Sequence, residues 1–167
     1  CWWGGIKVMI LAAFFGGGGA DWVGAGSGAD AAMIGRKAET VDHGLALHSG
    51  HLEDPLEVLR RLGGREFAAI AGAIIAARTQ VAVVLEGFAA TAAAAVLHRA
   101  NPAALDHCLL GYVAATQPGH RRLAEKIGLT PLFDLGMGEG EGTGAALAAG
   151  TVKAAALIHS GMLAATL

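Results

Sequence analysis

The sequence predicts an α/β domain in which a mainly parallel sheet is layered with helices in a Rossmann-like, three-layer arrangement. Segments of strand and helix character alternate through the second half of the chain, which is typical of parallel sheets. The run Val81–Leu85 is continuously β-favouring, as expected of a strand covered on both faces. Glycine turns join these segments. The length of 167 residues suits one α/β domain spanning residues 1–167.

The first part of the chain is predicted to be helical with glycine-rich breaks. Residues Val8–Phe15 are apolar on every side and are expected to form a buried helix or strand, which ends at Gly16–Gly19. A second glycine loop, Gly24–Gly28, follows. Asp30 can then cap a helix that runs to about Leu47.

The segment Asp54–Glu57 is a strong helix start. Asp54 suits the N-cap, Pro55 suits the first helical position, and the Glu57 carboxylate can reach back to the cap. The glycines at 63 and 64 are expected to end this helix, whose apolar stripe is Leu56, Leu59 and Leu62. The next helix, over residues 65–78, has small or apolar side chains on every face and is expected to be buried between neighbours.

The second half is expected to alternate strands with helices. The strands are residues 81–85, 109–114 and 132–135, and the helices are residues 89–99, a short one ending near 108, residues 121–127 and a terminal helix over 151–167. In a parallel sheet the carboxyl ends of the strands share one edge, and ligands bind beyond that edge. We therefore expect the turns at Glu86-Gly87 and Thr116–Gly119, and the loop that begins at Gly136, to meet there.

Composition excludes several classes of protein. The formal net charge is −2 and the basic residues are scattered, so the sequence carries no electrostatic signature of nucleic-acid binding. The longest apolar runs fall short of the ~18 to 20 residues that span a bilayer, and no secretory signal is apparent. Two cysteines, Cys1 and Cys108, make no disulfide framework, and Cys108 is expected to be a buried thiol. A cytoplasmic protein fits these features.

Two glycine loops are candidates for binding an anion. The segment Gly136–Ala148 places glycines at alternate positions and continues into an alanine-rich helix, and Gly24–Gly28 also precedes a helix. Bare backbone allows close approach of a ligand, and a helix N-terminus favours an anion. Neither loop is a Walker A motif, Gly26–Ala31 matches only a loose dinucleotide pattern, and packing alone is the alternative role for each loop.

Two glutamates, Glu139 and Glu141, lie in the second glycine loop and are candidates for a general base. A solvated pair is the alternative, because a helix N-terminus stabilises the carboxylate anion whereas burial under an aromatic ligand raises its pKa. His43, His48 and His51 lack the partners and spacing of a metal site. We expect neither a metal nor a cofactor.

Several ordered motifs resemble one enzyme family. From about Ala20 onward the chain resembles the carboxyl-terminal half of the nicotinate-nucleotide:dimethylbenzimidazole phosphoribosyltransferase family, which builds the lower ligand of cobalamin. The motifs are Asp54-Pro55-Leu56-Glu57-Val58-Leu59-Arg60-Arg61-Leu62-Gly63-Gly64, Glu86-Gly87-Phe88, Gln117-Pro118-Gly119-His120 and, the most specific, Gly140-Glu141-Gly142-Thr143-Gly144-Ala145-Ala146. The chain would then be the carboxyl-terminal part of a longer enzyme.

The resemblance implies a reaction and a set of site residues. A benzimidazole nitrogen attacks the ribose C1′ of nicotinate mononucleotide, nicotinate leaves, and α-ribazole phosphate forms. Glu141 would be the base that takes the azole proton, and members of the family are homodimers. The residues that the resemblance places around the nucleotide and its phosphate are Gly24, Gly26, Ser27, Gly28, Lys37, Gly87, Phe88, Gly140, Gly142, Thr143 and Gly144.

The chain departs from the family pattern at four positions. Ala25 replaces an arginine, Glu86 an aspartate, Ala115 a serine and Gln117 a glutamate, and the family's upstream Gly-Ile-Gly-Asn-Thr-Thr loop is not recognisable in residues 1–11. These departures favour an alternative, namely a non-catalytic relative that binds a nucleotide or azole, or an assembly subunit. A nucleotide-dependent oxidoreductase is a third hypothesis, which rests on the loose dinucleotide pattern alone.

Overall fold

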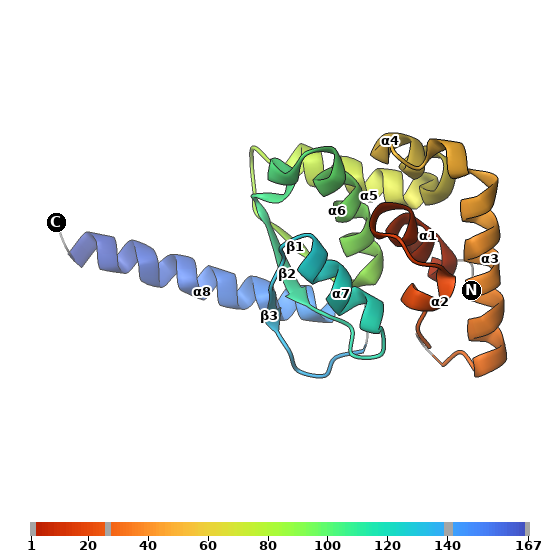
Figure 1. Cartoon of the computed structure of the whole chain (residues 1–167). Helices are drawn as coiled ribbons and strands as arrows, with labels where there is room; N and C mark the ends of the chain where they lie inside the picture. Colours follow the sequence, from red (N-terminus) through yellow and green to blue (C-terminus); the bar gives the residue numbers. More distant parts are fainter. Residues whose placement is uncertain (1–2, 26–27, 139–141, 166–167) are drawn as a thin grey trace.

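A computed structural model gives the fold and describes residues 3–25, 28–138 and 142–165. Helices come first in the chain, and a parallel sheet interleaved with helices follows (Figure 1). In chain order the main elements are α1 (Trp3–Phe15), α2 (Gly19–Trp22), α3 (Ala31–Leu47), α4 (Pro55–Val58), α5 (Gly64–Ala77), β1 (Val83–Leu85), α6 (Gly87–Ala100), β2 (Cys108–Tyr112), α7 (Pro118–Lys126), β3 (Pro131–Phe133) and α8 (Thr143–Ala165). Short 3₁₀ turns lie at Ser49–His51 and Pro102–Leu105, and a π-helical turn lies at Leu59–Gly63.

The sheet is parallel throughout its described strands, in the order β1-β2-β3. Val83 lies opposite Cys108, and Leu110 lies opposite Pro131. The crossover helices α6 and α7 lie on one side of the sheet, and the first turns of α8 pack against the strands from the other side (Figure 1). The predicted α/β class with a layered parallel sheet is therefore confirmed, although helix makes up most of the chain.

The core is centred on α1 and α6. The segment that could have been helix or strand is helix α1, and its Val8, Ile10 and Leu11 are buried. In α6 the run from Ala92 to Leu97 is buried as well. Alanine side chains on α6 let neighbouring helices approach closely, and α1, α4, α5 and α7 all pack against it.

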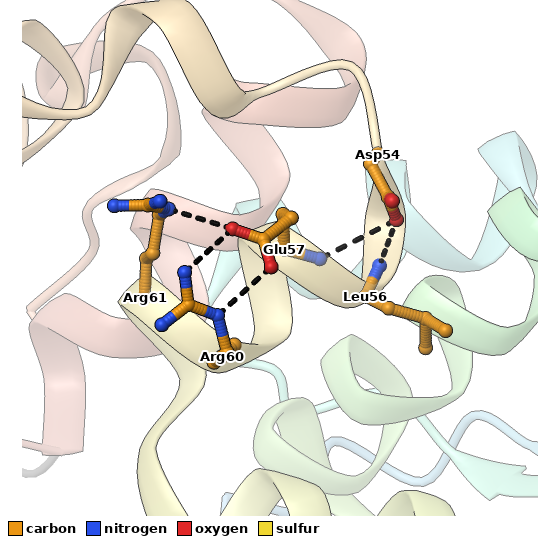
Figure 2. A network of polar contacts seen from close by, with 5 residues as sticks. All are labelled: Asp54, Leu56, Glu57, Arg60 and Arg61. Carbon is orange, nitrogen blue, oxygen red and sulfur yellow. Dashed lines mark hydrogen bonds and ion pairs between the residues drawn. The ribbon is translucent and has the colours of Figure 1, made fainter.

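The start of α4 is capped as predicted, but only in part (Figure 2). The Asp54 Oδ1 accepts hydrogen bonds from the N–H groups of Leu56 at 2.8 Å and Glu57 at 3.4 Å. Glu57 was expected to reach back to this cap, and instead its carboxylate pairs with Arg60 at 2.7 Å and Arg61 at 2.9 Å. Hydrogen bonds from the two guanidinium groups, Arg60 first, lower the pKa of Glu57 to about 2. Two cations one turn away outcompete a single backbone N–H.

The predicted apolar stripe and α5 are both buried only in part. Within the stripe, Leu56 is 60% exposed while Leu62 is buried. Helix α5 was expected to be buried on every face, yet only Phe67, Ala71 and Ile74 are buried, and Ile75 is 47% exposed. Most of the exposed face carries alanine and glycine, which expose little apolar area, so its composition did not reveal an outer side.

Each strand end lies within two residues of the predicted one. Strand β1 begins at Val83 rather than 81, because the N–H of Val81 closes the last turn of α5 on the Ala77 carbonyl. The short helix expected to end near 108 ends at residue 105, and Cys108 is instead the first residue of β2, buried as expected. Burial raises the pKa of the Cys108 thiol. Helix α7 starts earlier than predicted because Pro118 occupies its first turn.

Helix α8 is one continuous element from Thr143 to Ala165, so the predicted terminal helix is its distal part. Gly144 and Ala148 are buried near its start, whereas Leu157, Ile158 and Met162 are more than 60% exposed. The distal part projects away from the body of the molecule (Figure 1). No helix among the described residues has the length and apolarity needed to cross a membrane.

Candidate functional site

The carboxyl ends of the strands meet at one edge of the sheet, as the sequence predicts. The turn after β1 reaches the start of α8, because the Glu86 carboxylate accepts a hydrogen bond from the Gly142 N–H at 2.8 Å. The segment after β2 pairs with the loop after β3, since the Ala115 N–H donates to the Met137 carbonyl at 3.0 Å. Three turns that are far apart in the sequence are thus held together by hydrogen bonds at this edge.

A small cavity lies beside this edge, between α1, α3 and the turns after β1 and β2. It encloses about 30 Å³. Three residues that the resemblance assigns to the nucleotide site, Gly24, Lys37 and Phe88, line it together. Lys7 and Gln117 line it as well. The structure therefore brings together residues that are up to about a hundred positions apart in the chain.

Two lysines give this cavity a positive charge. The Lys7 Nζ donates a hydrogen bond to Gln117 Oε1 at 2.6 Å and lies 4.6 Å from the centre of the Phe88 ring, a cation–π contact. Burial, and secondly the charge of Lys37, lower the pKa of Lys7 to about 8. Neither lysine pairs with a carboxylate in the described part of the chain. Such a cavity suits an anion.

A buried histidine supports the aromatic wall of the cavity. The His120 ring stacks on Phe88, with 5.4 Å between ring centres and 13° between planes. His120 has no exposed surface, and burial lowers its pKa to about 4, with smaller contributions from Lys7 and Arg121. The ring is therefore neutral at pH 7.

The tautomer of His120 follows from its partners. Nδ1 accepts a hydrogen bond from the Ala114 N–H at 3.0 Å, so the proton lies on Nε2 and is donated to Thr91 Oγ1 at 2.9 Å. The Thr91 hydroxyl in turn donates to the Gly87 carbonyl at 2.9 Å. This chain of hydrogen bonds fixes the turn at Gly87, whose φ of +79° favours glycine. Phe88 is thereby held in place against the cavity.

The start of α8 already binds one carboxylate of the chain itself. Glu86 Oε1 accepts from the Gly142 N–H, and Glu86 Oε2 accepts from the Ala145 N–H at 2.5 Å. Glu86 is also the N-cap residue of α6. The anion that a helix N-terminus favours is here a side chain from the turn after β1.

The remaining described residues of the predicted binding site do not line this cavity. Gly142 has a φ of +87°, and Gly144 packs directly against the Tyr112 ring, where a Cβ would overlap it. These two glycines therefore have structural reasons for lacking a side chain. Gly28 and Thr143 are exposed and do not line the cavity.

Four residues of the predicted site lie outside the described residues, namely Gly26, Ser27, Gly140 and Glu141. Their roles stay predictions. The same holds for Glu139. Among the described residues, no group of three histidine, cysteine or acidic side chains is arranged to hold a metal ion.

Comparison with known proteins identifies the family of this chain. Residues 7–166 match the family model DBI_PRT, described as phosphoribosyltransferase. The chain belongs to this phosphoribosyltransferase family. Proteins named nicotinate-nucleotide--dimethylbenzimidazole phosphoribosyltransferase from Rhizobium etli and Brucella anthropi are each 60% identical to it over 158 residues. Those alignments cover 94% of this chain and 46% of each relative, so the chain spans about half the length of the curated relatives it matches.

Solved structures agree with the assignment to the phosphoribosyltransferase family. The crystal structure of CobT from Thermus thermophilus matches with a TM-score of 0.80 and 37% identity, covering 90% of this chain and 45% of that chain. A second structure from that organism, named as the same phosphoribosyltransferase, matches with a TM-score of 0.78. The resemblance inferred from the glycine loop and its flanking motifs is confirmed.

Proposed function

We propose that the protein to which this chain belongs transfers the ribose phosphate of nicotinate mononucleotide to 5,6-dimethylbenzimidazole. The products are α-ribazole phosphate and nicotinate, in the synthesis of the lower ligand of cobalamin. The observation that carries the proposal is the cavity in which Gly24, Lys37 and Phe88 lie together at the carboxyl edge of the sheet. The names of relatives that are 60% identical support it.

The proposed mechanism needs one base and one anion site. A ring nitrogen of the benzimidazole attacks C1′ of the ribose, the bond from C1′ to nicotinate breaks, and nicotinate leaves with the bonding electron pair. Glu141 takes the proton that the attacking azole loses. Lys37 and the backbone of the Gly24–Gly28 loop hold the phosphate, which fixes C1′ for attack. Phe88, supported by His120, shapes the wall beside the nucleotide.

The test is a release assay on the full-length protein. Incubation with nicotinate mononucleotide and dimethylbenzimidazole should release nicotinate, and Glu141→Gln should abolish turnover while sparing mononucleotide binding. Glu139→Gln is a matched control, because it removes a carboxylate two positions away in the same loop and should retain activity. Turnover by Glu141→Gln at the rate of the unsubstituted protein would remove Glu141 from the mechanism.

A non-catalytic relative that binds a nucleotide or azole, or an assembly subunit, is the second candidate. It is favoured by the contacts of two residues that depart from the family pattern, because Glu86 occupies the N–H groups at the start of α8 and Gln117 binds Lys7. Calorimetry that finds tight mononucleotide binding without nicotinate release by the full-length protein would favour this candidate. Absence of any nucleotide binding would exclude the nucleotide-binding relative.

The cellular location, oligomeric state and full length of the protein are proposed as well. We propose a cytoplasmic homodimer in which this chain is the carboxyl-terminal part of a longer polypeptide. The motifs that carry the resemblance support the homodimer and the carboxyl-terminal position, and the 46% coverage of the relatives supports a longer polypeptide. Sedimentation of the full-length protein at a range of concentrations would measure the dimer directly.

A further inference from the structure

Lys7 occupies a position in the cavity that the family motifs do not predict. The family's Gly-Ile-Gly-Asn-Thr-Thr loop is not recognisable in residues 1–11, and Lys7 lies in that stretch. It nevertheless lines the same cavity as Gly24 and Lys37, from the first turns of α1. It therefore adds a charge to the candidate site from an element that the resemblance leaves without a role.

Among the described residues, no ion pair balances the charges of Lys7 and Lys37. The Lys37 Nζ lies 3.6 Å from the point that a Cβ on Gly4 would occupy, so this ammonium group sits against the first turn of α1. Two lysines thus meet at one cavity, and the described residues supply no carboxylate that forms an ion pair with either lysine.

The lowered pKa of Lys7 agrees with this geometry, since burial and Lys37 both disfavour its charged form. A bound anion would offset the repulsion between Lys7 and Lys37 and would stabilise both ammonium groups. The cavity of about 30 Å³ has room for about two water-sized groups, which is enough for two of the three free oxygens of a phosphate monoester.

We infer that Lys7 is a second cationic ligand for a phosphate monoester bound in this cavity, acting beside Lys37. The inference rests on the proposed function, in which that phosphate is the 5′-phosphate of a mononucleotide. Lys7 donates from one side through α1 and Lys37 from the other through α3, so the dianion is held by two charge-assisted hydrogen bonds. Gln117 and Phe88 hold the Lys7 ammonium at the cavity before the ligand arrives.

The experiment is calorimetric titration of the full-length protein that contains this chain, at pH 7 in a low-salt, phosphate-free buffer. The probes are inorganic phosphate, nicotinate mononucleotide and nicotinate riboside, which lacks the phosphate. Lys7→Gln and Lys7→Met both remove the charge, and the methionine keeps an apolar stem against Phe88. Lys153→Gln, an exposed lysine on α8, is the matched control.

Both Lys7 variants should bind phosphate and the mononucleotide roughly ten- to a hundredfold more weakly, as expected for the loss of a charged hydrogen-bond donor. Riboside binding and the control variant should be unchanged. Unchanged mononucleotide binding in either folded variant, an equal loss for the riboside, or no binding of either phosphate ligand by the unsubstituted protein would overturn the inference.

The outcome is separable from that of the proposed function. If the full-length protein binds phosphate through Lys7 but releases no nicotinate, the inference about Lys7 stands and the proposed reaction is excluded. If nicotinate release depends on Glu141 but both Lys7 variants bind phosphate fully, the proposed reaction stands and the inference about Lys7 is excluded.

Discussion

Glu86 joins the turn after β1 to the start of α8 through one carboxylate. Its two oxygens accept from the N–H groups of Gly142 and Ala145, which would otherwise be free at the end of a helix. Glu86→Gln removes the charge and leaves one good acceptor instead of two. We expect this substitution to lower the free energy of unfolding by about 1 to 2 kcal/mol, measured by urea denaturation.

The control for this prediction is Glu125→Gln. Glu125 is exposed on α7, and the same change of charge there should alter the free energy of unfolding by less than about 0.5 kcal/mol. Equal effects at the two positions would mean that Glu86 contributes only through net charge. The hydrogen bonds at the start of α8 would then add nothing to stability.

The sequence predicted some residues of the site and missed others, for physical reasons. Gly24, Lys37 and Phe88 could be assigned because each lies in or near a motif with a recognisable order. Lys7 could not, because its role depends on a contact with Gln117, which is 110 positions away. The support given by His120 also depends on distant partners, since neither its burial nor its bond to a threonine on α6 is visible in local sequence.

At the scale of elements, the start of α8 offers a test of why its loop is rich in glycine. Gly144 is buried against the Tyr112 ring, and a Cβ there would overlap that ring. Gly150 lies later in the same helix, is exposed, and has open space where a Cβ would stand. Gly144→Ala should cost about 1 to 3 kcal/mol of stability through overpacking, whereas Gly150→Ala should gain up to about 1 kcal/mol through helix propensity.

Urea denaturation of the two alanine variants side by side gives the measurement. Opposite signs would show that the glycine at 144 is required for packing of α8 on β2, in addition to any role in binding. A gain of stability in Gly144→Ala would contradict the close packing of α8 against Tyr112.

The cap of α4 provides a second test at this scale. Asp54→Ala removes the acceptor of the Leu56 and Glu57 N–H groups and should cost about 1 kcal/mol, measured in the same way. Glu53→Ala changes the neighbouring exposed carboxylate and should have little effect. A loss of the same size at residue 53 would assign the effect to charge near the helix start rather than to the cap.

Element types were easier to predict from the sequence than their exposed faces. The cap at Asp30, the helix start at Asp54 and the apolar run of β1 depend on local chemistry, and the structure confirms all three. The burial of α5 and the partner of Glu57 depend on which neighbours are present. Burial on every face of α5 and a contact of Glu57 with the cap were both wrong expectations. Small residues on α5 fit either environment, so composition could not distinguish them.

At the scale of the whole molecule, one buried residue, His120, contacts both the cavity wall and the core. His120 stacks on the cavity wall, bonds α6 through Thr91, and accepts from the backbone after β2. The stability of the fold and the shape of the site are therefore coupled through one neutral imidazole. Its titration should be visible in the stability of the entire chain.

The free energy of unfolding should fall steeply between pH 6.5 and pH 4. The pKa of His120 is lowered from 6.5 to about 4 in the folded chain, so the unfolded chain binds a proton first as the pH falls. The stability from a neutral His120 is fully present above pH 6.5 and is lost as the pH passes through about 4, a change of about 3 kcal/mol. Glu57, whose pKa is lowered to about 2, loses its contribution mainly below that window.

Urea denaturation at a series of pH values measures this slope. His120→Gln should be less stable at pH 7, because Thr91 and the Ala114 N–H lose their partner, but its stability should fall much less between pH 6.5 and pH 4. His159→Gln, which changes an exposed histidine on α8, should keep the slope of the unsubstituted chain. An unchanged slope in His120→Gln would assign the acid sensitivity to other groups and would separate the stability of the fold from the cavity wall.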